Sequence, residues 1–201
     1  MSFRVTPNTL VLAAGLLLLC VRANAADRQV RPFFGATFGG GGTFLDPEET
    51  IGKPNPAIGV SAVFLSELFG AEFEVADAPG FFGPGDKHLV IHSRVTTISG
   101  NVIVAAPRRW TEYWLRPYIV GGGGFMRVRT TTSFNVFDVS RVIPEVDLGV
   151  GVVAFLTNRV GVSWDLRRFQ SIGSDSTEMG VSLGGESLSF WRATMAAVIR
   201  Y

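Results

Sequence analysis

The sequence predicts an all-β chain folded as an eight-stranded antiparallel up-and-down transmembrane β-barrel. Two observations carry this prediction: the alternation of residues in the last strand, and an even number of similar runs whose connections alternate between long and short. Successive side chains of a strand point to opposite faces, so a spanning strand needs one apolar face toward lipid. About 10 residues of such alternation suffice to cross a bilayer.

The C-terminal segment, residues 189–201, meets this requirement from Trp191 to the terminus. Alternate residues counted back from the terminus are all apolar: Tyr201, Ile199, Ala197, Met195, Ala193 and Trp191. The other parity includes Arg200 and Arg192. One face therefore suits lipid, with an aromatic side chain at each end, and the other face admits charge. This pattern is typical of a strand in a membrane barrel.

Seven upstream runs show similar alternation and are separated by clusters of Gly, Pro, Asn and Asp that are typical of turns. We expect strands at about residues 30–41, 57–65, 69–76, 91–106, 115–130, 144–156 and 159–169. Long connections follow strands one, three, five and seven, as extracellular loops do in outer-membrane barrels. The connection after strand four is longer than the other turns. Within strand four, Val95 disagrees in parity with Val102 and Val104, which favours a β-bulge.

Residues 1–25 are expected to form a secretory signal peptide, which leaves residues 26–201 as the barrel domain. The apolar run from Leu10 to Val21 is too short to span a bilayer as a helix, and a small-x-small cleavage site follows it. An uncleaved anchor is the alternative. Cys20, the only cysteine, lies in this segment, so we expect no disulfide and no thiol chemistry in the mature chain.

Composition suits a membrane protein and argues against nucleic-acid binding. Hydrophobic residues make up 47% of the 201 residues. Without Arg4 and Arg22 the 18 basic residues fall to 16, against 17 acidic ones, and no basic block stands out. We therefore expect outer-membrane lipid as a partner and no nucleic acid.

Charged residues within the predicted strands are assigned to the lumen. They form a balanced set of four acids and four arginines: Glu72, Glu74, Asp147, Asp165, Arg127, Arg129, Arg167 and Arg192. An eight-stranded barrel is only wide enough for its own side chains, and an unpaired buried charge is strongly unfavourable. We expect a structural network of ion pairs in the lumen, with a proton or ion path as the alternative.

The same assignment places the apolar parity of strand five on the lipid face: Tyr118, Val120, Met126 and Val128, opposite Arg127 and Arg129. Aromatic side chains near the short turns are expected to form a periplasmic belt, because amphipathic rings favour the membrane interface. This predicted belt comprises Trp110, Tyr113, Trp114, Tyr118 and Tyr201.

Other motifs lack the spacing of a catalytic or binding site. The glycine runs at residues 39–42 and 121–124 do not end in the Gly-Lys-Ser/Thr of a phosphate loop, and they more readily make room for lumenal side chains. His88 and His92 are too few ligands for zinc. The acidic residues at 46–49 lack the spacing of a calcium loop. We expect no catalytic residue, no metal and no cofactor.

Three features support a resemblance to a known family: Leu-Arg-Pro-Tyr at residues 115–118 before a glycine-rich stretch, Asp-Leu-Arg-Arg-Phe at residues 165–169, and the terminal Tyr201. The mature chain resembles the small OmpA/OmpX-type outer-membrane barrels, in particular the opacity-like porin family. The resemblance implies residence in the Gram-negative outer membrane and insertion by the barrel-assembly machinery, which reads the last strand. It implies no activity, because this scaffold serves adhesins, stress proteins and other surface proteins.

The predicted protein is thus a non-enzymatic, monomeric outer-membrane barrel with a structural or surface-interaction role through four extracellular loops, whose ligand is unknown. A lipid A deacylase-like enzyme is one alternative. Such enzymes have a His-x-Ser-Asn arrangement, whereas this chain has His92-Ser93-Arg94. A soluble lipocalin-like carrier is the other alternative, and it would keep the apolar parity inside.

Overall fold

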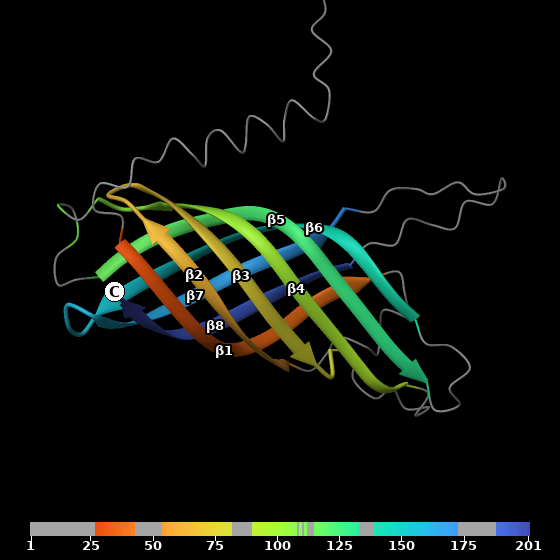
Figure 1. The fold of residues 1–201 in the computed structure, drawn as a ribbon. Helices are drawn as coiled ribbons and strands as arrows, with labels where there is room; N and C mark the ends of the chain where they lie inside the picture. The colour runs from red at the N-terminus through yellow and green to blue at the C-terminus, as the bar shows by residue number, and fades with distance from the viewer. Residues whose placement is uncertain are drawn as a thin grey trace, which may run out of the picture.

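The computed structural model is a closed barrel in which every strand pairs with its neighbour in sequence and β1 pairs with β8 (Figure 1). The strands are β1 (Asp27–Gly42), β2 (Asn55–Leu65), β3 (Phe69–Pro79), β4 (Val90–Ala105), β5 (Leu115–Thr132), β6 (Val139–Phe155), β7 (Val160–Ser171) and β8 (Leu188–Arg200). The structure describes residues 27–42, 54–81, 90–107, 109, 111, 115–132, 139–172 and 188–201. The predicted signal peptide lies outside these residues. No helix in the described part of the chain is long and apolar enough to cross a membrane.

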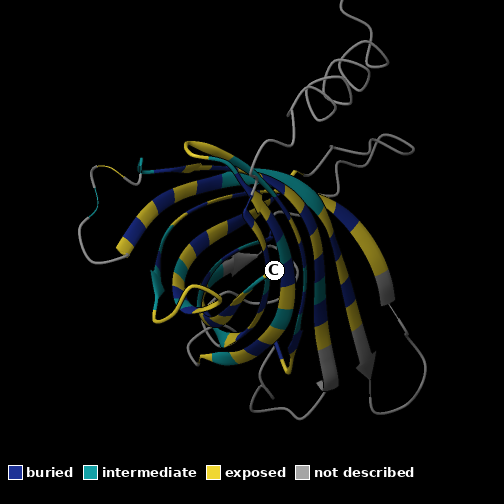
Figure 2. Cartoon of the chain, turned by 60° about the vertical axis from the view of Figure 1, so that its left-hand side comes forward, coloured by how far each residue is buried: buried dark blue, intermediate teal, exposed yellow. Residues whose placement is uncertain are grey.

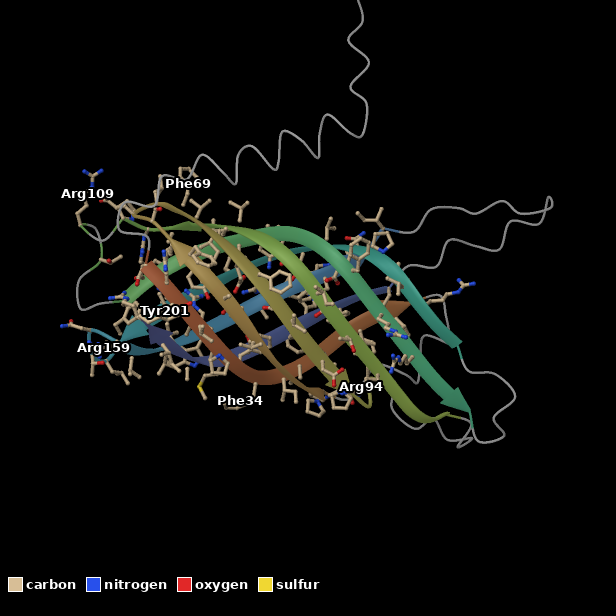
Figure 3. All side chains as sticks on the ribbon, in the orientation of Figure 1. Phe34, Phe69, Arg94, Arg109, Arg159 and Tyr201 are labelled. Carbon is tan, nitrogen blue, oxygen red and sulfur yellow. The ribbon has the colours of Figure 1, made fainter. Side chains whose placement is uncertain are left out.

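All eight pairings are antiparallel, which confirms the predicted all-β up-and-down barrel. The short turns after β2 and β6 lie at the same end as the C-terminus, where Figure 3 labels Arg159 and Tyr201. The β5 strand has 18 residues and is therefore about 60 Å long at the usual rise per residue. The hydrocarbon core of a bilayer is about 30 Å thick. The longest strands thus extend beyond any membrane that the barrel spans.

A band of large apolar side chains covers the outside of the barrel. The alternation of buried and exposed residues along each strand is visible as stripes in Figure 2. Exposed members of the band come from every strand and include Phe34, Ile58, Phe73, Ile98, Ile119, Leu148, Trp164 and Ile199. In β8 the apolar parity faces outward and Arg192 is buried, as expected. An apolar exterior contradicts the lipocalin-like alternative, which needs a polar outer surface.

The predicted inner and outer faces of strand five are exchanged in the structure. Tyr118, Val120 and Met126 are buried, at 3%, 0% and 0% exposure, whereas Ile119 and Phe125 face outward. The prediction assumed that every charge within a strand belongs to the lumen. The β5 strand instead continues past the apolar band, where an outward charge no longer faces hydrocarbon.

The irregularity of β4 lies at its start, where the β4–β5 register shifts between Val90 and His92, and not between Val95 and Val102. The β3–β4 register runs without a shift from Phe69 opposite Val104 to Pro79 opposite Arg94. Val95 is buried because it packs inside the barrel, while Val102 faces outward. The two parities disagree in the sequence because Val102 and Val104 lie on the outer face, whereas Val95, near the start of β4, lies on the inner face next to the exposed Arg94.

The interior contains two large apolar clusters with a polar layer between them, and a small third cluster of Phe33, Ala76 and Ala196. The floor cluster, at the end with the short turns, contains Val63, Leu65, Ile103, Ala105, Tyr118, Val120, Val153 and Val198. The cap cluster, at the opposite end, contains Ala57, Ala78, Phe81, Val95, Met126, Val128, Ile143, Phe169, Leu188 and Phe190. Within the cap, the rings of Phe169 and Phe190 stack with centroids 5.0 Å apart.

Candidate functional site

Arg167 of β7 is the centre of the polar layer. Its Nη1 lies 2.8 Å from Glu72 Oε2 and 3.2 Å from Glu74 Oε2, and its Nη2 lies 3.2 Å from Asp165 Oδ1. Glu72 and Glu74 come from β3, which lies across the barrel interior from β7. Both point inward because residues two apart on a strand share a face. One guanidinium group therefore joins opposite walls of the barrel. A planar guanidinium suits this role because it donates in several directions at once.

Arg192 of β8 adds a second cation to the layer, on the side of Arg167 that is nearer the cap cluster. It pairs with Glu74, and its Nη1 donates to Thr97 Oγ1 at 3.3 Å. Its guanidinium carbon lies 4.4 Å from the ring centroid of Phe169 and 5.3 Å from that of Phe33. Cations over aromatic faces are stabilised, most strongly where water is excluded. Arg192 thus connects the charged layer to the apolar cap.

A chain of hydrogen bonds runs from this layer toward the end with the short turns. Tyr118 Oη donates to Asp165 Oδ2 at 2.6 Å and accepts from Arg31 Nη1 at 3.2 Å. Arg31 Nη2 donates to Gln29 Oε1 at 2.7 Å, and Gln29 Nε2 donates to Asp27 Oδ2 at 3.1 Å. The four polar side chains between Asp165 and the end with the short turns are therefore held in a defined order.

Asn101 and Asp147 complete the layer on the β4 and β6 walls. With its amide oriented to satisfy both neighbours, Asn101 donates to Asp147 Oδ1 at 2.8 Å and accepts from Arg167 Nη1 at 3.0 Å. Asp147 Oδ2 lies 4.0 Å from Arg167 Nη1, a longer contact than those of Glu72 and Glu74.

Glycines on β6 make room for these large side chains. A Cβ added at Gly151 would lie 2.5 Å from the ring of Tyr118, and one at Gly149 would lie 2.6 Å from the side chain of Arg167. A Cβ at Gly122 of β5 would meet the side chain of Asn101 at 2.2 Å. The lumen is therefore packed to the backbone around the ion pairs, as expected for eight strands.

Glu145 is the exception in this layer. It is 2% exposed, and neither carboxylate oxygen has a hydrogen-bond partner in the described part of the chain. The sequence prediction omitted Glu145 and Arg31 from the network, although Glu145 shares the parity of Asp147, which was assigned to the lumen, and Arg31 lies on the parity opposite the apolar Phe34 of its strand. Alternation alone was therefore a sufficient signal for both.

Six of the eight residues predicted for the lumenal network lie inside the barrel: Glu72, Glu74, Asp147, Asp165, Arg167 and Arg192. Arg127 and Arg129 do not, and their assignment was wrong. Both are exposed on the outer wall of β5, beyond Phe125. They lie past the end of the apolar band, where an outward charge meets a polar environment.

The predicted aromatic belt is corrected at one position. Tyr118 points into the lumen and belongs to the hydrogen-bond chain. Tyr201 is 72% exposed at the C-terminus. Trp110, Tyr113 and Trp114 lie outside the described residues, so the belt remains a prediction for them.

The described residues contain no group of three or more histidine, cysteine, aspartate or glutamate side chains that would hold a metal ion. The residues of the predicted enzymatic alternative, His92 and Ser93, lie in β4 opposite Thr131 and Thr130. Their side chains are outside the described ones. The polar layer is closed by apolar clusters at both ends, so its geometry suits cross-bracing of the barrel walls.

No protein-family model matches the sequence, and no characterised protein matches it in sequence. Solved structures do share the fold. Neisserial surface protein A is 11% identical with a TM-score of 0.64, and the match covers 87% of this chain and 97% of that one. The N-terminal β-barrel domain of Pseudomonas aeruginosa OprF is 15% identical with a TM-score of 0.55, and the match covers 88% and 98%.

A third similar structure is Ail, the attachment invasion locus protein of Yersinia pestis, which was solved in complex with the heparin analogue sucrose octasulfate. It is 9% identical with a TM-score of 0.50, and the match covers 87% of this chain and 97% of Ail. These likenesses concern the fold. Together with the exposed apolar band, they confirm the predicted outer-membrane type of barrel.

Proposed function

We propose that this chain is an integral outer-membrane protein whose barrel is a rigid, closed support for the four segments that join β1 to β2, β3 to β4, β5 to β6 and β7 to β8. The observation that carries the proposal is an apolar outer band around an interior of mutually bonded charges. A water-filled channel would need a wider barrel. The apolar exterior needs lipid, because exposed apolar surface of this extent is unfavourable in water.

The role is structural or adhesive rather than enzymatic. Within the described residues, and with the exception of Glu145, the central interior polar groups are committed to one another: Arg167 to three carboxylates, and Tyr118 to Arg31 and Asp165. Groups held in this way stabilise a scaffold. Surface interaction is then expected at the connecting segments, as loops on a rigid support commonly carry function.

Fractionation of envelopes, with gels of boiled and unboiled protein, tests the membrane assignment. We expect the protein in the outer-membrane fraction and a faster-migrating unboiled form, because the closed barrel resists detergent until it is heated. Recovery in a soluble fraction with a single mobility would contradict the proposal. Removal of the terminal Tyr201 is expected to lower the inserted fraction, since the barrel-assembly machinery is proposed to read β8.

The surface role is tested by replacing residues 44–53 with a Gly-Ser linker of equal length, with residues 133–138 replaced in a matched variant. Both variants should keep the heat-dependent mobility, because the strands are unchanged. Loss of cell attachment in either variant, with insertion retained, would assign the interaction to that segment. Attachment equal to that of the unmodified protein in both variants would favour a purely structural role.

A further inference from the structure

Glu145 of β6 is a buried carboxylate whose two oxygens have no hydrogen-bond partner among the described residues. The residue is only 2% exposed and shares the inward parity of Asp147. Buried polar groups in folded proteins are nearly always hydrogen-bonded, and a carboxylate without a partner is strongly unfavourable in a packed interior. Glu145 is therefore a position at which a bound group is expected.

Asp147 presents a further oxygen of this kind on the same wall. It lies two residues from Glu145, so the two side chains share a face and start about 7 Å apart. Its Oδ1 accepts from Asn101 at 2.8 Å in the orientation described above. Its Oδ2 has no hydrogen-bond partner among the described residues and lies 4.0 Å from Arg167 Nη1. Neighbouring positions of β6 thus direct three carboxylate oxygens into the interior without a hydrogen-bond donor in the described part of the chain.

The interior between the floor cluster and the cap cluster holds more acids than arginines. Its described charged side chains are five carboxylates and three guanidinium groups: Glu72, Glu74, Glu145, Asp147, Asp165, Arg31, Arg167 and Arg192. Other inward charges lie at the end with the short turns, where Asp27 pairs with Arg200, and Arg116 donates to the carbonyl of Ala106. The layer therefore has two negative charges in excess, which a packed interior tolerates only when a cation compensates for them.

Arg192 does not provide this compensation for Glu145. The charges that act on Glu145 are the carboxylates of Asp147 and Glu74 and the guanidinium of Arg192. Arg192 is paired with Glu74, and its Nη1 donates to Thr97 Oγ1. Its Nε has no hydrogen-bond partner among the described residues, so it does not bond to Glu145. The nearest guanidinium is thus committed to the opposite wall of the barrel.

The inner wall beside Glu145 carries small side chains. Its cross-strand partners are Gly124 of β5 and Ser171 of β7. In the same row, Ser99 of β4 lies opposite Gly124, and Glu74 of β3 lies opposite Ser99. From Glu145 to Glu74 the wall therefore carries only a glycine and a serine, which leave space for a small ion and its water.

We infer that Glu145 and Asp147 bind a hard divalent cation, Ca²⁺ or Mg²⁺, in the interior of the barrel. Both ions favour carboxylate oxygens. A doubly charged ion matches the excess of two negative charges, whereas a monovalent ion would leave one carboxylate uncompensated. The described residues offer no group of three acidic, histidine or cysteine side chains that would hold a metal by themselves, so water completes the coordination, as both ions allow.

The cation is taken up while the barrel folds, because the cap cluster and the floor cluster close the layer at both ends. The inference goes beyond the proposed function, and it does not depend on what the connecting segments bind. It concerns the charge balance of the interior alone.

The test folds the full-length protein from urea into phosphatidylcholine vesicles with about 10 mM CaCl₂ or MgCl₂, or with choline chloride at the same ionic strength. Calcium sites of low affinity have a Kd of about 10⁻⁴–10⁻³ M. The ratio of folded to unfolded protein should therefore rise about 10- to 100-fold with the bound ion, and not with choline. The ion that gives the larger rise is the one that the site prefers.

Glu145→Gln and Asp147→Asn should each lose most of this rise, because each removes a charged ligand. Without a divalent cation, Glu145→Gln should be at least as stable as the unmodified protein. Glu67→Gln is the matched control, because Glu67 is an exposed acid at the end with the short turns. It should keep the full rise. Heat-dependent mobility checks that each variant is a folded barrel.

Metal content gives a second, independent measurement. After external ions are removed with a chelating resin, the folded protein should retain about one divalent ion per chain, and the double variant Glu145→Gln/Asp147→Asn should retain none. An equal rise in stability for the unmodified protein and Glu145→Gln would overturn the inference, as would the absence of any rise with both ions. Loss of the rise in Asp46→Asn/Glu48→Gln/Glu49→Gln, with the rise retained in Glu145→Gln, would also overturn it in favour of a site in the connecting segment. A barrel that fails to insert in every sample would instead contradict the proposed function.

Discussion

The buried arginines of the lumen and the exposed arginines of the outer wall are the same residue type in opposite environments. Arg167 and Arg192 are almost fully buried, and each is paired with carboxylates from β3. Arg127 and Arg129 are exposed, beyond the last apolar row of β5. The comparison shows that a charged residue within a barrel strand need not point into the lumen. Its depth along the barrel must also be known, because only the middle of the wall faces hydrocarbon.

The largest expected effect is the removal of an inner arginine. Arg167→Met leaves Glu72 and Glu74 without their shared cation in a packed interior, so the free energy of unfolding should fall by about 3–5 kcal/mol. Urea unfolding of the folded barrel in lipid vesicles, followed by tryptophan fluorescence, measures it. Arg127→Met is the outer-wall control and should change stability by less than about 1 kcal/mol. Equal losses in the two variants would contradict the distinction between the two environments.

Removal of the hydroxyl of Tyr118 is expected to have the next largest effect. Tyr118→Phe keeps the ring in the floor cluster but removes the hydroxyl that joins Arg31 to Asp165. The expected loss is about 1.5–3 kcal/mol, since both partners are charged. Tyr201→Phe changes an exposed hydroxyl and should have little effect on the same unfolding curve. An unchanged free energy of unfolding in Tyr118→Phe would show that the chain of hydrogen bonds contributes nothing to stability.

A methyl group added on the inner face tests the packing of the lumen. Gly151→Ala places a Cβ 2.5 Å from the Tyr118 ring and 2.8 Å from Asp165 Oδ1, so we expect a loss of about 1–3 kcal/mol. Gly100→Ala is the outer-face control, because an added Cβ there meets nothing within 4 Å. Comparable thermal unfolding of both variants would indicate space in the lumen that the structure does not contain.

The smallest change is expected at Glu145. Glu145→Gln removes a buried carboxylate whose oxygens lack hydrogen-bond partners in the described residues, so stability should stay within about 0.5 kcal/mol or rise. Glu74→Gln, which removes the partner of Arg192, is the inner control and should be clearly destabilising. A marked loss in Glu145→Gln would reveal a cation partner for this carboxylate outside the described residues.

Much of this arrangement was predictable from alternation. The two faces of β8 follow from its own thirteen residues, since every outward position from Trp191 to Ile199 is apolar and the charged Arg192 lies on the other parity. The inward facing of Glu72, Glu74 and Asp147 was predicted in the same way. Strand β5 was not predictable by this rule, because Tyr118 and Ile119 are both apolar and the glycines at residues 121–124 carry no facing signal.

The sequence by itself determined the number of strands, their antiparallel order and the need for an apolar exterior, because local alternation and turn residues are enough to specify them. Only the tertiary structure decided which arginines are buried and which meet the membrane surface. Parity is a property of a single strand, whereas depth depends on how far each strand is shifted against its neighbours when the barrel closes. That shift places Arg167 level with Glu72 across the lumen and leaves Arg129 beside Arg94 on the outer wall.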